Sequence, residues 1–337
     1  MAIRYRFFQQ WQVAVTDIAL QSSKIASSIL DLIGNTPIVD ISELSPNPKA
    51  SIFIKLEGQN PGGSIKDRVA LSMIETAERE GLLTRGSTLI EPSSGNTGIG
   101  MALICRVKGY KLKVVMPPNV SKERRELLEI WGAEIIDSPD GEGSNGAVKL
   151  ARKIASDHPD WVFLYQYANQ ANPKAHFENT GPEILRDLPN ITHFVAGLGT
   201  SGTLIGVGSY LKQEKPEVQI WAVEPPAGEV VDGLRSLDDG YIPPIFIENN
   251  GPLLLDRKTV VGPRDSIIWT KKLAEVGIFA GISTGAALSG AIKCANSIDT
   301  GVILIISPDA GWKYLSSEIW TLSIDEAVER TKSTIYF

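Results

Sequence analysis

A lysine at the end of a glycine-rich turn is the first residue in the chain that could carry covalent chemistry. Lys66 follows the turn residues 61–63, an apolar helical pattern begins directly after it, and Ser64 and Asp67 have the spacing of a capping box. In the first turn of a helix, the positive end of the helix dipole and any burial favour the neutral amine. A neutral amine is what Schiff-base formation requires. A solvated lysine after an ordinary helix cap is the alternative that this motif alone leaves open.

A second candidate site is the run Gly-Leu-Gly-Thr-Ser-Gly-Thr at residues 197–203, between an apolar strand pattern and a helical pattern. Backbone N–H groups and three hydroxyls would converge there on the positive end of a helix, which predicts a phosphate cradle formed by Gly199, Thr200, Ser201, Gly202 and Thr203. The run has neither the lysine of a nucleotide P-loop nor the spacing of a dinucleotide fingerprint, so a small phosphorylated ligand fits better than ATP or NAD. A tight turn that merely needs glycine is the alternative.

Two further turns present polar groups where helices are expected to begin. One is the run of Ser93, Ser94, Gly95, Asn96 and Thr97, whose hydroxyl and N–H donors suit a carboxylate, while the amide of Asn96 could donate to an oxyanion. In the run 281–285, Ser283 could offer a neutral hydroxyl to a ring nitrogen. Helix capping is the competing interpretation of both turns. Together, the amine, the phosphate cradle, the carboxylate site and the hydroxyl indicate pyridoxal 5′-phosphate acting on an amino acid.

Composition limits the classes of partner and cofactor. The chain has 337 residues, 43% of them hydrophobic, and a net charge of −6 without a basic block, which argues against nucleic acid. No apolar run is long enough for a membrane span, and three scattered histidines offer no metal-ligand spacing, so neither membrane nor metal is expected. Cys105 and Cys294 lie in apolar helical patterns and predict buried free thiols in a reducing, cytoplasmic compartment. Residues 1–28 lack the features of a secretory signal and are interpreted as an extension, with organellar targeting left open.

Strand and helix patterns alternate from about residue 28 onward. Apolar strands are predicted at 51–57, 87–91, 111–117, 133–136, 161–164, 192–196, 219–224 and 301–307, with helices between them and a long loop with short helices over 222–259. Such alternation predicts an α/β fold, with parallel βαβ units covered by helices on both faces. We expect two three-layer α/β/α domains with mainly parallel twisted sheets. The smaller, mobile domain would span 55–165, and the larger domain would combine 29–54 with 166–337.

Several motifs in a fixed order resemble the cysteine synthase family of fold-type II pyridoxal-phosphate enzymes, similar to the β-subunit of tryptophan synthase. The similarity runs from about residue 29 to 323 and is carried by the stretches 33–37, 60–68, 94–98, 199–203, 277–286 and 314–316. It implies that Lys66 bonds to the coenzyme and moves the α-proton, that Asn96 contacts the 3′-oxygen, and that Ser283 faces the pyridine nitrogen. It also implies that the coenzyme phosphate lies at 199–203.

The same resemblance implies a substrate site and a reaction. The substrate carboxylate would be bound by Ser93, Ser94, Gly95, Thr97 and Gln166, with Ser93 standing where a threonine is usual. A neutral hydroxyl at the pyridine nitrogen makes the ring a weaker electron sink, which suits β-elimination. The implied reaction is a β-replacement. O-acetyl-L-serine or O-phospho-L-serine loses its leaving group and gains sulfur from sulfide, thiosulfate or a protein thiocarboxylate, yielding L-cysteine or S-sulfocysteine.

Details of residues 165–173, 176–183 and 309–316 resemble the B-type branch, which includes O-acetylserine and O-phosphoserine sulfhydrylases. Arg235 aligns with an arginine that meets the substrate phosphate in phosphoserine users, and an arginine fork suits phosphate. Similar arginines occur in acetylserine users, and a surface ion pair is the alternative.

The resemblance leaves several alternatives open. Cystathionine β-synthase and serine or threonine dehydratase share the fold, and a catalytically silent scaffold that binds a partner's C-terminal peptide is a non-enzymatic alternative. The implied partners are a second copy of the chain in a homodimer and, as further candidates, a sulfur-carrier protein or the tail of serine acetyltransferase. The aromatic end of residues 331–337 could cover the cleft as a lid.

Overall fold

The computed structural model describes residues 25–333 and the side chains of residues 25–331. Residues 25–32 group separately from the chain that begins at Ile33. The first group contains the short 3-10 helix η1 (Ile29–Leu32), and the two sheets and the candidate site belong to the second. Apart from residues 25–28, the predicted N-terminal extension lies outside the described residues, as do residues 334–337 of the predicted lid.

Two sheets organise the chain from Ile33 onward. The larger sheet has the order β1-β2-β10-β7-β8-β9 and is formed by β1 (Ile38–Asp40), β2 (Ala50–Leu56), β7 (His193–Gly197), β8 (Gln219–Glu224), β9 (Arg257–Val260) and β10 (Gly301–Ser307). The smaller sheet has the order β5-β4-β3-β6 and is formed by β3 (Thr88–Pro92), β4 (Lys111–Met116), β5 (Glu134–Asp137) and β6 (Val162–Phe163). Every neighbouring pair is parallel except β1 with β2. The predicted α/β fold with mainly parallel sheets is therefore confirmed.

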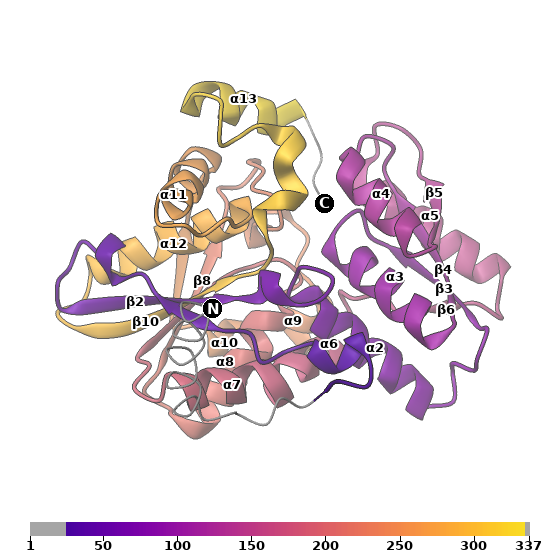
Figure 1. Ribbon diagram of the computed structural model, residues 1–337, viewed down its shortest axis with the longest axis horizontal. Helices are drawn as coiled ribbons and strands as arrows, with labels where there is room; N and C mark the ends of the chain where they lie inside the picture. Colours follow the sequence, from indigo (N-terminus) through magenta and orange to yellow (C-terminus); the bar gives the residue numbers. More distant parts are fainter. Residues whose placement is uncertain (1–24, 334–337) are drawn as a thin grey trace, which may run out of the picture. The chain divides into compact units, whose positions relative to one another are not determined.

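The larger sheet is covered on both faces because successive residues of a strand point to opposite sides. In β10, Ile303 and Ile305 pack into one apolar cluster with α11 (Pro263–Glu275) and α12 (Ile282–Ala295). Leu304 and Ile306 pack into the opposite cluster with α7 (Gly181–Asp187) and α8 (Gly202–Glu214). Figure 1 shows these two pairs of helices on opposite sides of β2 and β10. Burial on both faces explains why these strands read as continuous apolar runs in the sequence.

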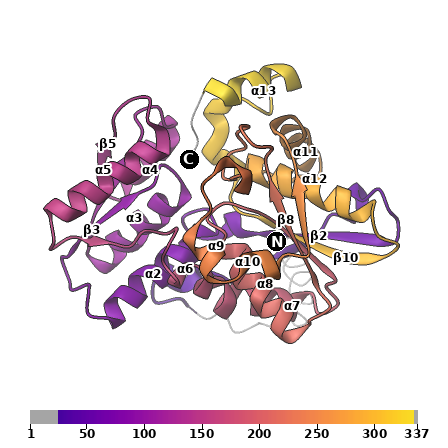
Figure 2. The same cartoon turned by 180° about the vertical axis from the view of Figure 1, so that it is seen from behind.

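The smaller sheet is surrounded by α2 (Lys66–Arg79), α3 (Asn96–Lys108), α4 (Lys122–Ile130) and α5 (Gly143–Asp157). These helices gather around β3 to β5 in the view from behind (Figure 2). Ala147 and Ala151 of α5 pack on Ile90 and Val115, so small residues let this helix approach the sheet closely. The remaining elements are η2 (Ser42–Leu44), η3 (Glu57–Gln59), α6 (Ala171–Ala175), the π-helical turn η4 (His176–Thr180), η5 (Leu237–Asp239), α9 (Pro244–Glu248), α10 (Gly251–Leu254), η6 (Gly311–Ser317) and α13 (Ile324–Ser333).

One strand lies where the sequence predicts a loop. β9 begins inside the predicted loop 222–259 and ends one residue beyond it, and of its residues only Thr259 is buried. An edge strand with charged residues such as Arg257 and Lys258 on its exposed positions gives almost no hydrophobic signal, which explains the error.

Candidate active site

One cavity brings together every position to which the sequence assigns chemistry. It lies beyond the carboxyl ends of β3, β7 and β10, where parallel α/β sheets usually bind ligands. The predicted residues that line it are Lys66, Ser93, Ser94, Gly95, Asn96, Thr97, Gln166, Gly199, Thr200, Ser201, Gly202, Thr203, Arg235 and Ser283. Their convergence is observed, whereas the role of each residue stays a prediction.

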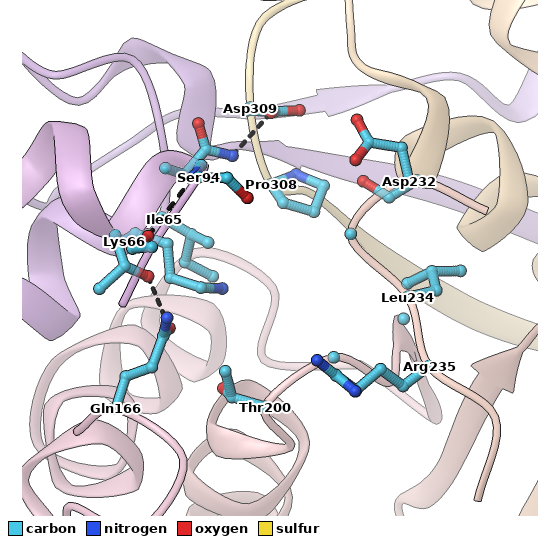
Figure 3. A pocket seen from close by; sticks show the side chains of 18 of the residues that line it. Ile65, Lys66, Ser94, Gln166, Thr200, Asp232, Leu234, Arg235, Pro308 and Asp309 are labelled. Carbon is cyan, nitrogen blue, oxygen red and sulfur yellow. Dashed lines mark hydrogen bonds between the residues drawn. The ribbon is translucent and has the colours of Figure 1, made fainter. Parts of the chain in front are cut away.

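Lys66 is the first residue of α2 and directs its amine into this cavity (Figure 3). The turn before it is fixed because the N–H of Ile65 donates to the carbonyl oxygen of Pro308 at 2.8 Å. Burial lowers the pKa of the Lys66 amine, against the opposing effect of Asp309. No hydrogen bond or salt bridge holds this amine within residues 25–331, so it is available to a ligand.

The prediction of a capping box at Ser64 and Asp67 was wrong, because the structure has Ile65 at the N-cap of α2 and no side-chain cap. The hydroxyl of Ser64 accepts the N–H of Lys66 at 3.2 Å, two residues on, while Asp67 accepts the N–H of Gly62 inside the turn. Both polar side chains therefore shape the turn itself. Its glycine cannot be replaced easily, because a Cβ on Gly62 would lie 2.5 Å from Oδ1 of Asp67.

A buried charge cluster anchors α2 directly behind Lys66. The guanidinium of Arg68 donates to Oε2 of Glu57 and to Oε1 of Glu183, each at 2.7 Å. The amine of Lys55 lies 2.8 Å from Oε2 of Glu183. Burial alone would raise the pKa of Glu183, but the hydrogen bonds from Arg68 and Lys55 outweigh it and lower the pKa to about 2. The cluster joins α2 to β2 and α7 and so fixes where Lys66 begins its helix.

The glycine-rich turn between β7 and α8 has the geometry of an anion cradle. Ser201 has a left-handed backbone with φ of 74°, and its buried hydroxyl has no hydrogen-bond partner within residues 25–331. A Cβ on Gly199 would lie 2.7 Å from the carbonyl oxygen of Gly233, and one on Gly202 would lie 1.9 Å from Oδ1 of Asn172. Only glycine fits at these two positions, so the backbone N–H groups at the start of α8 stay accessible to a ligand.

Two residues support this turn from below and were not assigned a role from the sequence. The amide of Asn172 donates to Oγ1 of Thr200 at 3.0 Å, and Nε2 of His176 lies 3.3 Å from Oγ1 of Thr203. Burial, with Lys66 and Arg68 nearby, lowers the pKa of His176 well below its usual value, so the imidazole is neutral. Both residues lie in the segment 171–180, which has no sequence pattern that indicates a contact with residues 199–203. Only the fold shows this contact.

The turn 93–97 leads from β3 into α3. Ser93 closes it by accepting the N–H of Gly98 at 2.9 Å, while the buried hydroxyl of Ser94 has no partner within residues 25–331. Oγ1 of Thr97 donates to Oε1 of Gln166 at 2.6 Å. The free hydroxyl of Ser94 and the amide nitrogen of Gln166, from segments far apart in the sequence, therefore remain as donors for a carboxylate.

Asn96 is held from both sides of its amide. Its Nδ2 donates to Oδ2 of Asp309, and the amine of Lys313 donates to its Oδ1, each at 2.7 Å. Burial lowers the pKa of Lys313 to about 8. Because Nδ2 carries two hydrogens, one donor of Asn96 is left for a ligand.

Comparison with known proteins identifies the family. Residues 29–309 match the family described as pyridoxal-phosphate dependent enzyme. The chain belongs to this family. A cysteine synthase of Staphylococcus aureus strain N315 is 41% identical over 311 residues, covering 89% of this chain and 99% of the relative.

Solved structures agree with this assignment. An O-ureido-L-serine synthase superposes with a TM-score of 0.82 at 36% identity, covering 89% of this chain and 98% of its own. A cysteine synthase from Entamoeba histolytica gives a TM-score of 0.84 at 30% identity, covering 94% of this chain and 98% of its own. The predicted family and the predicted cofactor, pyridoxal 5′-phosphate, are confirmed.

The cavity of this pyridoxal-phosphate dependent enzyme fits the coenzyme on three independent observations. The amine of Lys66 is buried, has a lowered pKa and has no partner among the described side chains. The turn 199–203 carries an unpartnered buried hydroxyl and two glycines that cannot accept a Cβ. Ser283 lies at the start of α12 and lines the same cavity with an uncharged hydroxyl. An aldehyde, a phosphate and a ring nitrogen each find a matching group.

Arg235 of the pyridoxal-phosphate dependent enzyme also lines the cavity, and its guanidinium extends toward the side on which Lys66 and Thr200 lie (Figure 3). It donates to the hydroxyl of Tyr167 at 3.2 Å, and its central carbon lies 5.0 Å from the ring centroid of Tyr167 and 5.4 Å from that of Tyr241. It forms no salt bridge with any described carboxylate. Contacts with the rings of Tyr167 and Tyr241, which meet edge to face, therefore hold it in a half-buried position at the cavity.

The polar residues of the cavity that were not predicted include Arg124, Asp232, Asp309 and Tyr314. Nη2 of Arg124 lies 3.1 Å from Oδ2 of Asp232, and the hydroxyl of Tyr314 donates to Oδ2 of Asp309 at 2.6 Å. Arg124 comes from α4, beside the smaller sheet, and Asp232 from the segment after β8 of the larger sheet. In the sequence, Arg124 sits among ordinary helical charges, and no local pattern connects the two.

Within residues 25–333, no helix combines the length and apolar character that crossing a membrane requires. The same residues contain no cluster of three or more His, Cys, Asp or Glu side chains suited to a metal ion. Cys105 and Cys294 are both buried and free, as predicted.

Proposed function

We propose that this enzyme makes L-cysteine by β-replacement on an O-activated L-serine. The observation that carries the proposal is the convergence on one cavity of an unpartnered lysine amine whose pKa is lowered by burial, an anion cradle and a carboxylate site. The 41% identity to a cysteine synthase across nearly the whole chain supports it.

Each part of the cavity has a proposed task. Bound pyridoxal 5′-phosphate supplies an aldehyde that joins to an amine and a ring that delocalises charge developing at the amino-acid α-carbon. Residues 199–203 would hold its phosphate, Asn96 would contact the ring oxygen, and Ser283 would face the ring nitrogen. Lys66 takes the proton from the α-carbon and later returns it, because burial lowers the pKa of its amine and so favours the form that can accept a proton.

The substrate carboxylate is proposed to rest on Ser94, Thr97 and Gln166, with the turn closed behind it by Ser93. This position places the α-carbon on the side of Lys66. The arrangement favours proton removal at that carbon because Lys66 and Thr97 belong to helix starts and Gln166 is fixed by its hydrogen bond from Thr97.

We further propose that Arg235 binds the leaving group and that O-phospho-L-serine is a better substrate than O-acetyl-L-serine. A guanidinium fixed on two tyrosine rings suits a phosphate dianion, whereas an acetyl ester carries no charge to pair with it. A charged hydrogen bond of about 1.5–3 kcal/mol corresponds to about 10- to 100-fold in kcat/KM.

The test compares both donors in Arg235→Ala and in Arg257→Ala, a control arginine that stacks on Trp221 at the sheet edge outside the cavity. We expect kcat/KM for O-phospho-L-serine to fall about 10- to 100-fold more in Arg235→Ala than kcat/KM for O-acetyl-L-serine, by the same estimate. Equal losses for the two donors would reject the phosphate role.

A product assay tests the reaction itself. With sulfide or thiosulfate present, the enzyme should form L-cysteine or S-sulfocysteine, and borohydride should fix the coenzyme to Lys66. Release of ammonia and a keto acid as the main products, even with sulfur donor present, would instead favour the dehydratase alternative. A protein that binds no coenzyme would contradict the proposal.

Three finer expectations accompany this function. We propose that residues 55–165 move as a smaller domain against the remainder, which is supported by the fact that β3 to β6 all lie within that range. We also propose a homodimer and a cytoplasmic location. Light scattering of the purified protein tests the dimer, and fractionation of cells tests the location.

A further inference from the structure

Asp232 is a buried carboxylate, and its Oδ1 accepts no hydrogen bond from the described residues. It lies in the segment after β8 and lines the cavity. Its Oδ2 is paired with Nη2 of Arg124 at 3.1 Å, whereas its Oδ1 is buried without a hydrogen-bond partner within residues 25–331. An unsatisfied buried acceptor is costly to a fold, so such an atom indicates a missing donor.

The proposed tasks of the cavity leave this carboxylate unused. Figure 3 shows Asp232 across the cavity from Lys66, on the side where Asp309 lies. Lys66 is required for the proton at the α-carbon. A protonated sulfur nucleophile brings a second proton into the cavity, and this proton needs an acceptor elsewhere.

We propose that Asp232 is the catalytic base that takes the proton from a sulfhydryl nucleophile, either hydrogen sulfide or a small thiol. This inference rests on the proposed function. The S–H bond breaks and its proton goes to Oδ1, while the sulfur electron pair forms the new bond to the β-carbon that the leaving group has vacated. The electron pair displaced from that carbon is taken up when Lys66 returns its proton at the α-carbon. Asp232 then releases its proton to solvent.

The surroundings of Asp232 suit this task. Burial raises the pKa of Asp232 to about 7, with Arg124 opposing the rise and Asp309 adding to it. The hydroxyl of Tyr314 also faces it and lowers the pKa. A base near neutrality is well matched to a thiol whose ordinary pKa is about 8.5. The hydrogen bond from Nη2 of Arg124 to Oδ2 can hold the side chain in place whether or not Oδ1 carries the proton.

Thiosulfate gives an internal control because this anion has no proton to lose at neutral pH. A purely structural role of Asp232 would affect every sulfur donor alike, whereas a base affects only donors that carry a proton. The matched control variant is Asp238→Asn, on an exposed aspartate of the same segment that pairs with Lys258.

The experiment separates the two halves of the reaction by rapid mixing of the coenzyme-loaded enzyme. Release of acetate or phosphate without a sulfur donor should stay within about twofold of wild type in Asp232→Asn. The subsequent reaction with an alkyl thiol should slow by about 10²- to 10⁴-fold at pH 7, the usual contribution of a general base. The deficit should shrink as rising pH ionises the thiol, and the reaction with thiosulfate should not slow.

If Asp232→Asn does not fold, a measurement on the wild type tests the role of Asp232. The thiol reaction should depend on a group that titrates near pH 7, and the thiosulfate reaction should lack this dependence. Equal slowing with thiol and thiosulfate in the variant, an unchanged thiol rate, or identical pH profiles for the two donors in the wild type would overturn the role of Asp232 alone. Failure of the wild type to form a sulfur product from any donor overturns both this role and the proposed function.

Discussion

Replacing Glu183 by glutamine measures how strongly the buried charge cluster behind Lys66 stabilises the fold. Its hydrogen bonds to Arg68 and Lys55 lower the pKa of Glu183 from 4.5 to about 2. One pKa unit corresponds to about 1.4 kcal/mol, so these interactions contribute about 3 kcal/mol at pH 7. The loss expected in Glu183→Gln is therefore about 3 kcal/mol, close to the usual cost of breaking a buried ion pair.

The pH dependence of this loss has a definite sign. Because the pKa of Glu183 is lower in the folded state than in the unfolded state, its stabilisation is complete above about 4.5 and disappears as pH falls toward 2. The difference in unfolding free energy between wild type and Glu183→Gln should therefore narrow from about 3 kcal/mol at pH 7 to about 2 kcal/mol at pH 3.5.

Denaturant unfolding of the coenzyme-loaded proteins at pH 7, 5.5 and 3.5 measures this difference directly. Glu178→Gln is the control, since Glu178 forms an exposed pair with Lys174 and its loss should cost less than about 0.5 kcal/mol at any pH. A difference below about 1 kcal/mol at pH 7, or one that does not change with pH, would refute the reasoning that the buried ion pairs carry this stability.

Three further predictions concern the cavity. Glu91→Ala should raise KM for the amino-acid substrate about tenfold, and Glu91→Gln should raise it less, because the carboxylate accepts the N–H groups of Tyr165 and Gln166. Burial raises the pKa of Glu91 to about 7, so KM of the wild type should also rise as pH falls below 7. Kinetics measured across this pH range check both predictions. Lys313→Met should weaken coenzyme binding about tenfold by freeing the amide of Asn96, whereas Lys313→Arg should retain most of it, as an absorbance titration would reveal. Gly199→Ala should also weaken coenzyme binding, since its Cβ would lie 2.7 Å from a carbonyl oxygen, and a normal dissociation constant would contradict the cradle geometry.

Much of the site could be predicted because its parts are local. The turn before Lys66 and the turn at residues 199–203 each combine glycine, hydroxyl side chains and a helix start within a few positions of the sequence. Such a ligand-binding turn can be recognised from the sequence alone, because the backbone groups that bind the ligand belong to the same turn as the side chains. The parallel strands could be predicted for a similar reason. A strand that is buried on both faces of its sheet appears in the sequence as a continuous run of apolar residues.

The remaining residues could not be predicted because their function depends on distant partners. Arg124 meets Asp232 across 108 positions of sequence, and Asn96 meets Asp309 across 213. Arg124, Asp232 and Asp309 look like ordinary charged residues until the two sheets bring them to the cavity, whereas Asn96 was predicted from its own turn. The edge strand β9 was not predicted, because its residues are mostly exposed and show no apolar pattern in the sequence.

The double attachment of Asn96 has a consequence for how ligands enter. Because Asp309 and Lys313 already orient its amide, the conformational entropy of that side chain is lost during folding, before any ligand arrives. The amide of Asn96 is therefore preorganised for ligand binding. Amide groups of Asn96 observed by NMR should be as rigid in the empty protein as in the loaded one.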